Sequence, residues 1–345
     1  MLQIMKKVLK YFPVVAILML LAPSCEEIIE FKGEKTESKM VMYSMLNPDS
    51  VITVSVSKSH AVFDIKYEPE QITDAIVRLY CDGDFVETLT YVAPPPPCEY
   101  CQPVSHSRYV SQGIKPVPGS TYRIEAEVPG LKSVSAETSI PDMVPILSID
   151  TVTEKEDEYN TFLVTKVKFS DPAVTENYYM LSVTRLEGYY TGDPALPFNP
   201  DAPVKVMISD DGYAAHEDPI IAPAQEEDLF GMYLENRFNV FNDELISGKE
   251  YDLTLKMNIS RKPDTDYFEF THFRIALYTI TKDMYLYLRS YSAHLQTRNS
   301  FFAEPVLVYS NVLNGLGVVG ARVSSVATIE IGSYPVEGVT YQNGY

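Results

Sequence analysis

Short runs of alternating apolar and polar residues recur along this chain, separated by turns rich in proline and glycine. Val51–Ser57 reads Val-Ile-Thr-Val-Ser-Val-Ser, a period of two that is typical of a strand with one buried face. Asp82-Gly83 separates two further runs and predicts a hairpin, because glycine accepts a positive φ without steric cost. With 24 prolines and 16 glycines, the pattern restricts the chain to an all-β fold.

The strands predicted in the first part of the chain form one domain. They are Met40–Met45, Val51–Ser57, Ile76–Tyr80, Phe85–Leu89, Thr121–Val128 and Lys132–Ile140. Short strands at regular spacing, with Pro-Gly turns before the last two, are typical of sandwiches. We therefore expect an N-terminal immunoglobulin-like β-sandwich over residues 39–141.

A second, larger β domain with long loops is expected over residues 146–345. The 321 residues from Cys25 onward exceed the usual span of one hydrophobic core, and Pro141–Pro145 interrupts the strand pattern. The strands predicted beyond this boundary are Thr161–Phe169, Tyr178–Leu186, Val204–Ile208, Tyr251–Ile259 and Phe268–Tyr278. The first two of these are expected to pair across an Asp171-Pro172 turn.

One helix is predicted in the C-terminal half of the chain. Met284, Leu288, Tyr291 and Leu295 recur with the period of an amphipathic helix. Thr281 stands where an N-cap is expected. We predict a helix near residues 282–298 that packs its apolar stripe on the sheet of the second domain, followed by glycine-rich strands.

The first 25 residues indicate where the chain is directed. Three lysines precede an 11-residue apolar run, Phe12–Ala22, and Cys25 follows shortly after. As a helix this run rises about 16 Å, roughly half the hydrocarbon thickness of a bilayer, so residues 1–24 are predicted to be a signal peptide. Its end resembles the lipobox of bacterial lipoproteins, in which signal peptidase II cuts before a cysteine that then carries diacylglycerol.

The lipobox resemblance implies that Cys25 carries the diacylglycerol and an acyl chain such as palmitate. A polar tether over residues 25–38 follows it. Glu26, Glu27 and Glu30 resemble the surface-export signal of Bacteroidota lipoproteins, which implies lipid anchoring in the outer membrane with the protein facing the cell exterior. Ordinary secretion, with Cys25 as a plain thiol, is the alternative.

The charge of the chain excludes some partners. Beyond residue 24 there are 25 basic and 47 acidic residues, a formal net charge of −22. Nucleic acid and anionic lipid surfaces are therefore poor partners.

Three cysteines besides Cys25 have more than one interpretation. Cys81, Cys98 and Cys101 would give one disulfide and one leftover thiol in an oxidising compartment, which we favour. A zinc site that includes His106 and free or variably paired thiols are the alternatives.

The loops predicted over residues 187–230 are the candidate ligand-contact region, together with the loop over residues 94–109, because loops carry variation while sheets hold position. The candidate contact residues are Tyr189, Tyr190, Tyr213 and His216. Carboxylates gather in the same loops, and the weak calcium candidates are Asp210, Asp211 and Asp218. Their spacing is not that of an EF-hand, so a solvated acidic loop is the favoured interpretation.

The motif search predicts no catalytic residues and no cofactor other than the lipid on Cys25. Gly315-x-Gly317-x-x-Gly320 matches the dinucleotide-binding string, but the 25 residues that follow it read as strands and lack the required helix. We interpret it as a glycine-rich strand or loop that another backbone approaches closely. No Gly-x-Ser-x-Gly or His-Glu-x-x-His motif occurs, although triads assembled from distant residues leave a cryptic hydrolase open.

An ordered set of motifs resembles the Bacteroidota lipoprotein group catalogued as domain-of-unknown-function family 4249. They are Met40–Asn47, Pro118–Tyr122, Thr138–Pro141, Phe169–Pro172, Asn177–Tyr179, the late helix and Asn311–Ala321. The resemblance implies a surface lipoprotein whose genes often neighbour those of TonB-dependent transporters. It implies no catalytic residues.

These observations lead to one expected function and two alternatives. We expect a non-enzymatic outer-membrane lipoprotein that acts as an accessory or ligand-capture partner of a TonB-dependent transporter and contacts an unknown nutrient. A structural or adhesive surface protein without a transporter is the first alternative. A cryptic surface hydrolase is the second.

Overall fold

A computed structural model describes residues 37–60, 70–94, 108–157, 160–190, 204–209, 218–221, 236–259, 268–297 and 306–332, without the side chains of residues 187–190, 204–209 and 268–271. Ser38–Tyr345 form one compact unit, distinct from Met1–Glu37. Within the described residues, no helix is long and apolar enough to cross a membrane.

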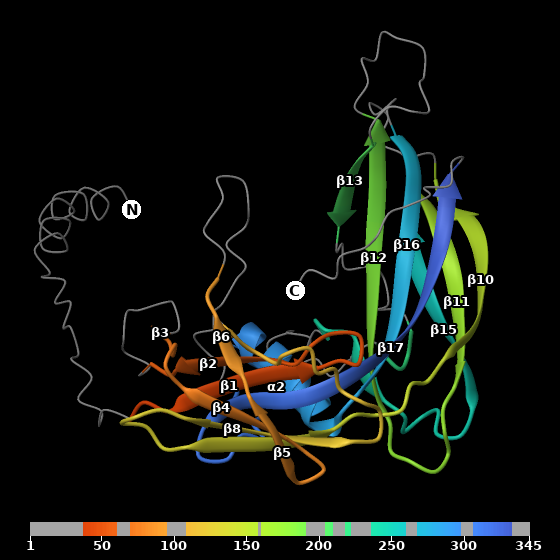
Figure 1. Cartoon of the computed structure of the whole chain (residues 1–345). Helices are drawn as coiled ribbons and strands as arrows, with labels where there is room; N and C mark the ends of the chain where they lie inside the picture. Colours follow the sequence, from red (N-terminus) through yellow and green to blue (C-terminus); the bar gives the residue numbers. More distant parts are fainter. Residues whose placement is uncertain are drawn as a thin grey trace, which may run out of the picture. The chain divides into compact units, whose positions relative to one another are not determined.

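The largest sheet has the strand order β13-β12-β16-β17-β1-β2-β7-β6, with β14 on β12 and β3 on β2 (Figure 1). Its strands are β1 (Met40–Leu46), β2 (Thr53–Lys58), β3 (Glu70–Gln71), β6 (Thr90–Val92), β7 (Arg108–Val110), β12 (Tyr178–Tyr190), β13 (Val204–Ser209), β14 (Val240–Asn242), β16 (Phe268–Ile280) and β17 (Leu316–Gly332).

Two smaller sheets have the orders β5-β4-β8-β9 and β10-β11-β15. Their strands are β4 (Ile76–Cys81), β5 (Asp84–Thr88), β8 (Thr121–Glu127), β9 (Val134–Ser139), β10 (Ile146–Lys155), β11 (Thr161–Ser170) and β15 (Glu250–Asn258). The expected all-β class is confirmed.

Strand β17 takes part in both halves of the large sheet, and Figure 1 shows it running from β1 to the side of β16. Leu316–Ala321 pair in parallel with β1, and residues 322–332 pair antiparallel with β16. The sequence predicted closing strands within the second domain. Instead, the first part of β17 completes the sheet that contains β1 and β2.

Each smaller sheet covers one half of the large sheet and encloses a separate core. In the first core, Met42 of β1 and Leu79 of β4 are fully buried in one cluster. In the second, Phe169 of β11 and Ile275 of β16 are buried together. The compact unit therefore consists of two β-sandwiches that share one large sheet.

Helix α2 (Lys282–Thr297) confirms the helix predicted from the apolar period. Met284 and Leu288 are buried as predicted, in a cluster that also holds Val318 of β17 and Tyr178 of β12. Since these strands belong to different halves of the large sheet, α2 packs over their junction rather than on the second half alone.

Strands β11 and β12 do not pair, so this prediction was wrong. Strand β11 lies between β10 and β15, whereas β12 lies beside β16. The link between them crosses from one sheet to the other, and buried Asp171 holds it by accepting hydrogen bonds from the Tyr179 hydroxyl and from the Gly248 N–H at 3.0 Å. Apolar periodicity identifies a strand but not its neighbour.

Polar side chains cover the edge of β17 that faces away from β1. The Asn311 side chain donates to the Val319 C=O at 2.8 Å and accepts from its N–H at 3.0 Å, as a neighbouring strand would. The Thr281 hydroxyl accepts from the Ala321 N–H at 3.2 Å. Thr281 does precede α2, with its C=O accepting from the Tyr285 N–H, but its hydroxyl bonds to β17.

Two glycines of the 315–320 string are required by close packing. A Cβ on Gly317, whose φ is +105°, would lie 2.1 Å from the Met42 carbonyl oxygen. A Cβ on Gly320 would lie 2.9 Å from atoms of Met284 in α2. The interpretation of this string as a close-approach segment is confirmed.

We expect Gly317→Ala to destabilise the protein more than Gly83→Ala, measured as the free energy of unfolding in urea. Both glycines have positive φ, so each variant carries a backbone strain of about 1–2 kcal/mol. Gly83, however, has open space around its Cβ position. Overlap with the Met42 carbonyl should cost Gly317→Ala at least about 1–3 kcal/mol more. Equal losses would contradict the close approach.

Candidate functional site

Most of the site residues predicted from the sequence lie outside the described residues. These are Cys25, Cys98, Cys101, Asp210, Asp211, Tyr213 and His216. The backbones of Tyr189 and Tyr190 lie at the end of β12, where they pair with Lys205 and Val204 of β13. They stay predictions as ligand contacts.

Cys81 is the last residue of β4 and is a half-buried free thiol among the described residues. Its Sγ donates to Asp82 Oδ2 at 3.6 Å. Because Cys98 and Cys101 lie outside the described residues, the disulfide stays a prediction.

Asp218 is buried, with 3% of its surface exposed. Its Oδ1 accepts from the Tyr251 hydroxyl at 2.8 Å and from the Ile220 N–H at 3.1 Å. Its Oδ2 accepts from the Thr254 N–H at 2.8 Å. Burial first, and then this hydrogen bond, raise the pKa of Tyr251. Both carboxylate oxygens thus tie the chain at 218–221 to the outer edge of β15.

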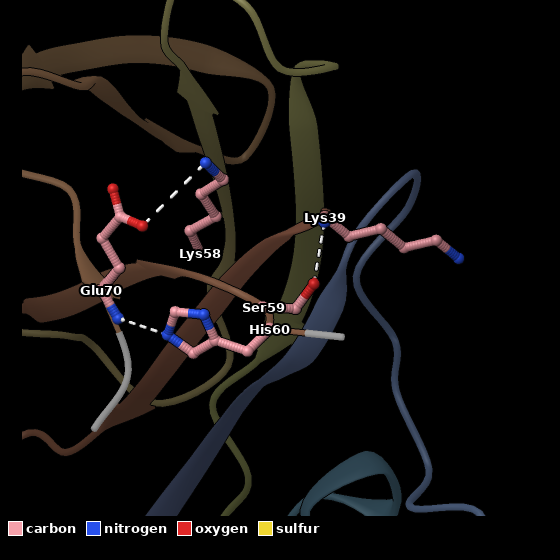
Figure 2. Close-up of polar contacts among 5 residues, drawn as sticks. All are labelled: Lys39, Lys58, Ser59, His60 and Glu70. Atoms are coloured by element: carbon pink, nitrogen blue, oxygen red, sulfur yellow. Dashed lines mark hydrogen bonds and ion pairs between the residues drawn. The ribbon is translucent and has the colours of Figure 1, made fainter. Parts of the chain in front are cut away.

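The point where the predicted tether enters the compact unit is fixed by short polar contacts (Figure 2). The Lys39 N–H donates to the Ser59 hydroxyl at 2.8 Å, and the Ser59 N–H donates to the Lys39 C=O at 2.8 Å. His60 Nε2 accepts from the Glu70 N–H at 3.2 Å, and Lys58 Nζ lies 4.0 Å from Glu70 Oε2. The start of β1 is therefore held to the end of β2.

A cleft of about 430 Å³ lies between the end of β9, the start of β12 and the start of α2. Its lining residues are Glu137–Pro141, Glu176–Tyr178 and Thr279–Asp283. These three segments come from distant parts of the sequence. We take this cleft as the candidate functional site.

One wall of the cleft holds a cation, an anion and a phenol in contact. Lys282 Nζ lies 3.0 Å from Glu176 Oε2 and 5.7 Å from the ring centroid of Tyr178. Hydrogen bonds with Tyr178 and then Glu176 raise the pKa of Lys282. Hydrogen bonds with Tyr178 and then Lys282 lower the pKa of Glu176. Burial raises the pKa of Tyr178, and its hydrogen bond with Glu176 adds to this effect.

All three shifts move titration away from neutral pH. Near pH 7 the wall holds an ammonium, a carboxylate and a neutral phenol. Efficient acid–base catalysis needs a group that titrates near the working pH. The arrangement is instead suited to hydrogen bonding and charge pairing with a bound group.

Hydrogen bonds to two buried carboxylates hold one segment of the cleft lining in place. Asn177 lines the cleft, and its side chain donates to Asp171 Oδ1 at 3.2 Å. The Asn177 N–H donates to Asp243 Oδ2 at 2.8 Å, and the Asp243 N–H donates back to the Asn177 C=O at 3.2 Å. Two of the motifs noted in the sequence, Phe169–Pro172 and Asn177–Tyr179, are therefore joined by a hydrogen bond.

A family model described as "Domain of unknown function (DUF4249)" matches residues 26–328. The chain belongs to this family. The match to the DUF4249 model begins directly after Cys25 and covers all described strands up to Thr328 of β17. No curated protein was found to match the chain.

The residues of the cleft were not predicted as a site from the sequence. Glu137 lies within β9, Glu176 lies shortly before β12 and Lys282 begins α2. No spacing rule connects these three charged residues. The one signal in the sequence is that Thr138–Pro141 and Asn177–Tyr179, which both contribute residues to the cleft lining, belong to the ordered motif set.

We expect the protein to lose stability as the pH rises from about 10 to about 12, in part through Tyr309. The Tyr309 hydroxyl donates to Asp283 of the cleft. Burial and then this bond raise the pKa of Tyr309 from its usual value near 10 to about 12. Since the folded state holds the proton more tightly, this stabilisation is complete below pH 10 and is lost as the pH rises through 12.

The variant Tyr309→Phe tests this directly in urea unfolding at several pH values. Between pH 10 and 12 its free energy of unfolding should fall less steeply with pH than that of the parent protein. The difference between the two slopes should correspond to the binding of up to about one proton. Below pH 9 the two curves should run parallel. Identical slopes above pH 10 would show that Tyr309 does not contribute.

Proposed function

We propose that this protein is a non-enzymatic surface lipoprotein, anchored in the outer membrane through Cys25, that acts as an accessory or ligand-capture partner of a TonB-dependent transporter. The observation that carries the proposal is the order of lysines, apolar run and cysteine in residues 1–25. The start of the family match at residue 26 supports it, because the family's common part then begins beside the lipid.

The proposed mechanism follows from the tether. Ser38, the first residue of the compact unit, lies 13 positions after Cys25, and this stretch spans at most about 45 Å when fully extended. A body held this close to a membrane partner meets it at a high effective concentration, on the order of millimolar. Weak contacts are then sufficient for a stable association.

The cleft supports a binding role rather than a catalytic one. Its Lys282–Glu176 pair stays charged and its Tyr178 stays neutral over a wide pH range, by the directions of their pKa shifts. Such groups present fixed donors and acceptors to a partner.

We expect Cys25→Ala to release the protein from the membrane, because lipidation requires the thiol. The measurement is fractionation of cells into membrane and soluble material, combined with metabolic labelling by a palmitate analogue. Ser24→Ala serves as the matched control, because it keeps both a small residue and the cysteine and should remain labelled and anchored. Retention of Cys25→Ala in the outer membrane would refute lipid anchoring.

We also expect a TonB-dependent barrel to co-purify with the protein in stoichiometric amount. The measurement is gentle detergent extraction of outer membranes from cells carrying a tagged version, followed by mass spectrometry. Cys25→Ala provides the control for association in the membrane. Recovery of the lipoprotein alone would contradict the transporter partnership and favour an adhesive role.

A further inference from the structure

The cleft is bounded on one side by the outer strand of a sheet. Strand β9 ends the order β5-β4-β8-β9. The Ser135 C=O points away from β8, because it accepts from the Leu313 N–H at 2.8 Å. The Ile140 N–H points toward β8, because it donates to the Ser120 C=O at 3.0 Å. Backbone groups alternate along a strand, so the N–H and C=O of Glu137 and Ser139 point outward.

This outward edge is open along the cleft. Leu313 forms a single bridge to Ser135, after which Asn311 bonds to β17 instead. Within the described residues, no main-chain hydrogen bond reaches the outward groups of Glu137 or Ser139. Both residues are exposed and both line the cleft. The edge therefore offers two donors and two acceptors at the spacing of a strand.

The charges around this edge favour a basic occupant. The cleft is lined by Glu137, Glu176 and Asp283 against the single cation Lys282, which already pairs with Glu176. In an added strand, the residue opposite Glu137 would have its side chain on the same face as that carboxylate. An arginine or lysine at this position would form a cross-strand charge pair.

We propose that the free edge of β9 is a docking site for an extended basic segment of a partner protein, which adds to β9 as a further strand with a basic residue opposite Glu137. Strand addition takes affinity from main-chain hydrogen bonds and specificity from alternate side chains. The open edge spans only about 7 Å. That is too short to hold a free peptide tightly, but it suits a partner kept near by the same membrane.

The inference deepens the proposed function by naming the contact that the cleft makes. Its test uses the purified full chain in detergent, where neither the transporter nor the membrane is present. A failure of peptide binding therefore leaves lipid anchoring and co-purification untouched, and a failure of those leaves peptide binding to be judged alone.

The probe is a fluorescent, end-blocked peptide, Thr-Val-Arg-Val-Thr, titrated by anisotropy. We expect a Kd of roughly 0.1–1 mM, since an effective concentration near millimolar makes that sufficient. Ser139→Pro removes the outward N–H and should weaken binding at least about tenfold, because proline cannot donate a hydrogen bond to an added strand. Ser139→Ala is the matched control, because it loses the same hydroxyl bond to Thr121 but keeps the N–H, and it should bind like the parent.

A charge exchange gives a second test that does not depend on proline. Glu137→Lys should weaken the arginine peptide and strengthen the peptide Thr-Val-Glu-Val-Thr, with circular dichroism confirming that both variants are folded. The proposal is overturned by no binding at millimolar peptide or by equal binding to Ser139→Pro and Ser139→Ala. It is equally overturned by a Kd below about 1 μM, which would indicate free-peptide capture, or by self-association of the protein that competes with the peptide.

Discussion

The hydrogen bonding of β17 on both of its edges is the constraint on which the rest of the structure depends. One strand can pair with β1 over residues 316–321 and with β16 over residues 322–332 only if the backbones come close at the crossing. Gly317 permits this against the Met42 carbonyl, and Gly320 permits it against α2. This crossing keeps the large sheet continuous and sets the position of α2. It thereby also sets the location of the cleft, which lies beside the first turn of α2.

Polar side chains form hydrogen bonds with backbone groups that the strands leave unpaired. Asn311 acts as a neighbour to β17 at Val319, Asp218 does so for β15 at Thr254, and Asp171 holds the link between two sheets. An unpaired backbone group costs about as much as a lost hydrogen bond when it is buried. These side chains therefore stabilise the folded state by satisfying backbone groups that would otherwise lack a hydrogen-bond partner.

The sequence predicted the individual strands and the helix better than it predicted which strands pair with each other. The hairpin at Asp82-Gly83, the helix and the strands with one buried face were recognisable, because their periods follow from the side that faces a core. Strand β10 was missed since most of its residues are exposed, which leaves no apolar alternation. The pairing of β1 with β17 and the meeting of Glu137, Glu176 and Lys282 were not predictable, because both depend on contacts between segments far apart along the chain.

The pairing of β1 with β17 also imposes an order on folding. Val41 and Leu316 are register partners 275 positions apart, so the sheet that contains β1 stays incomplete until almost the whole chain has been synthesised. Closing such a long loop is slow in comparison with local hairpins. Until then β1 has one open edge, which is a template for wrong pairing. The sheet that contains the first strand of the compact unit is thus the last to close.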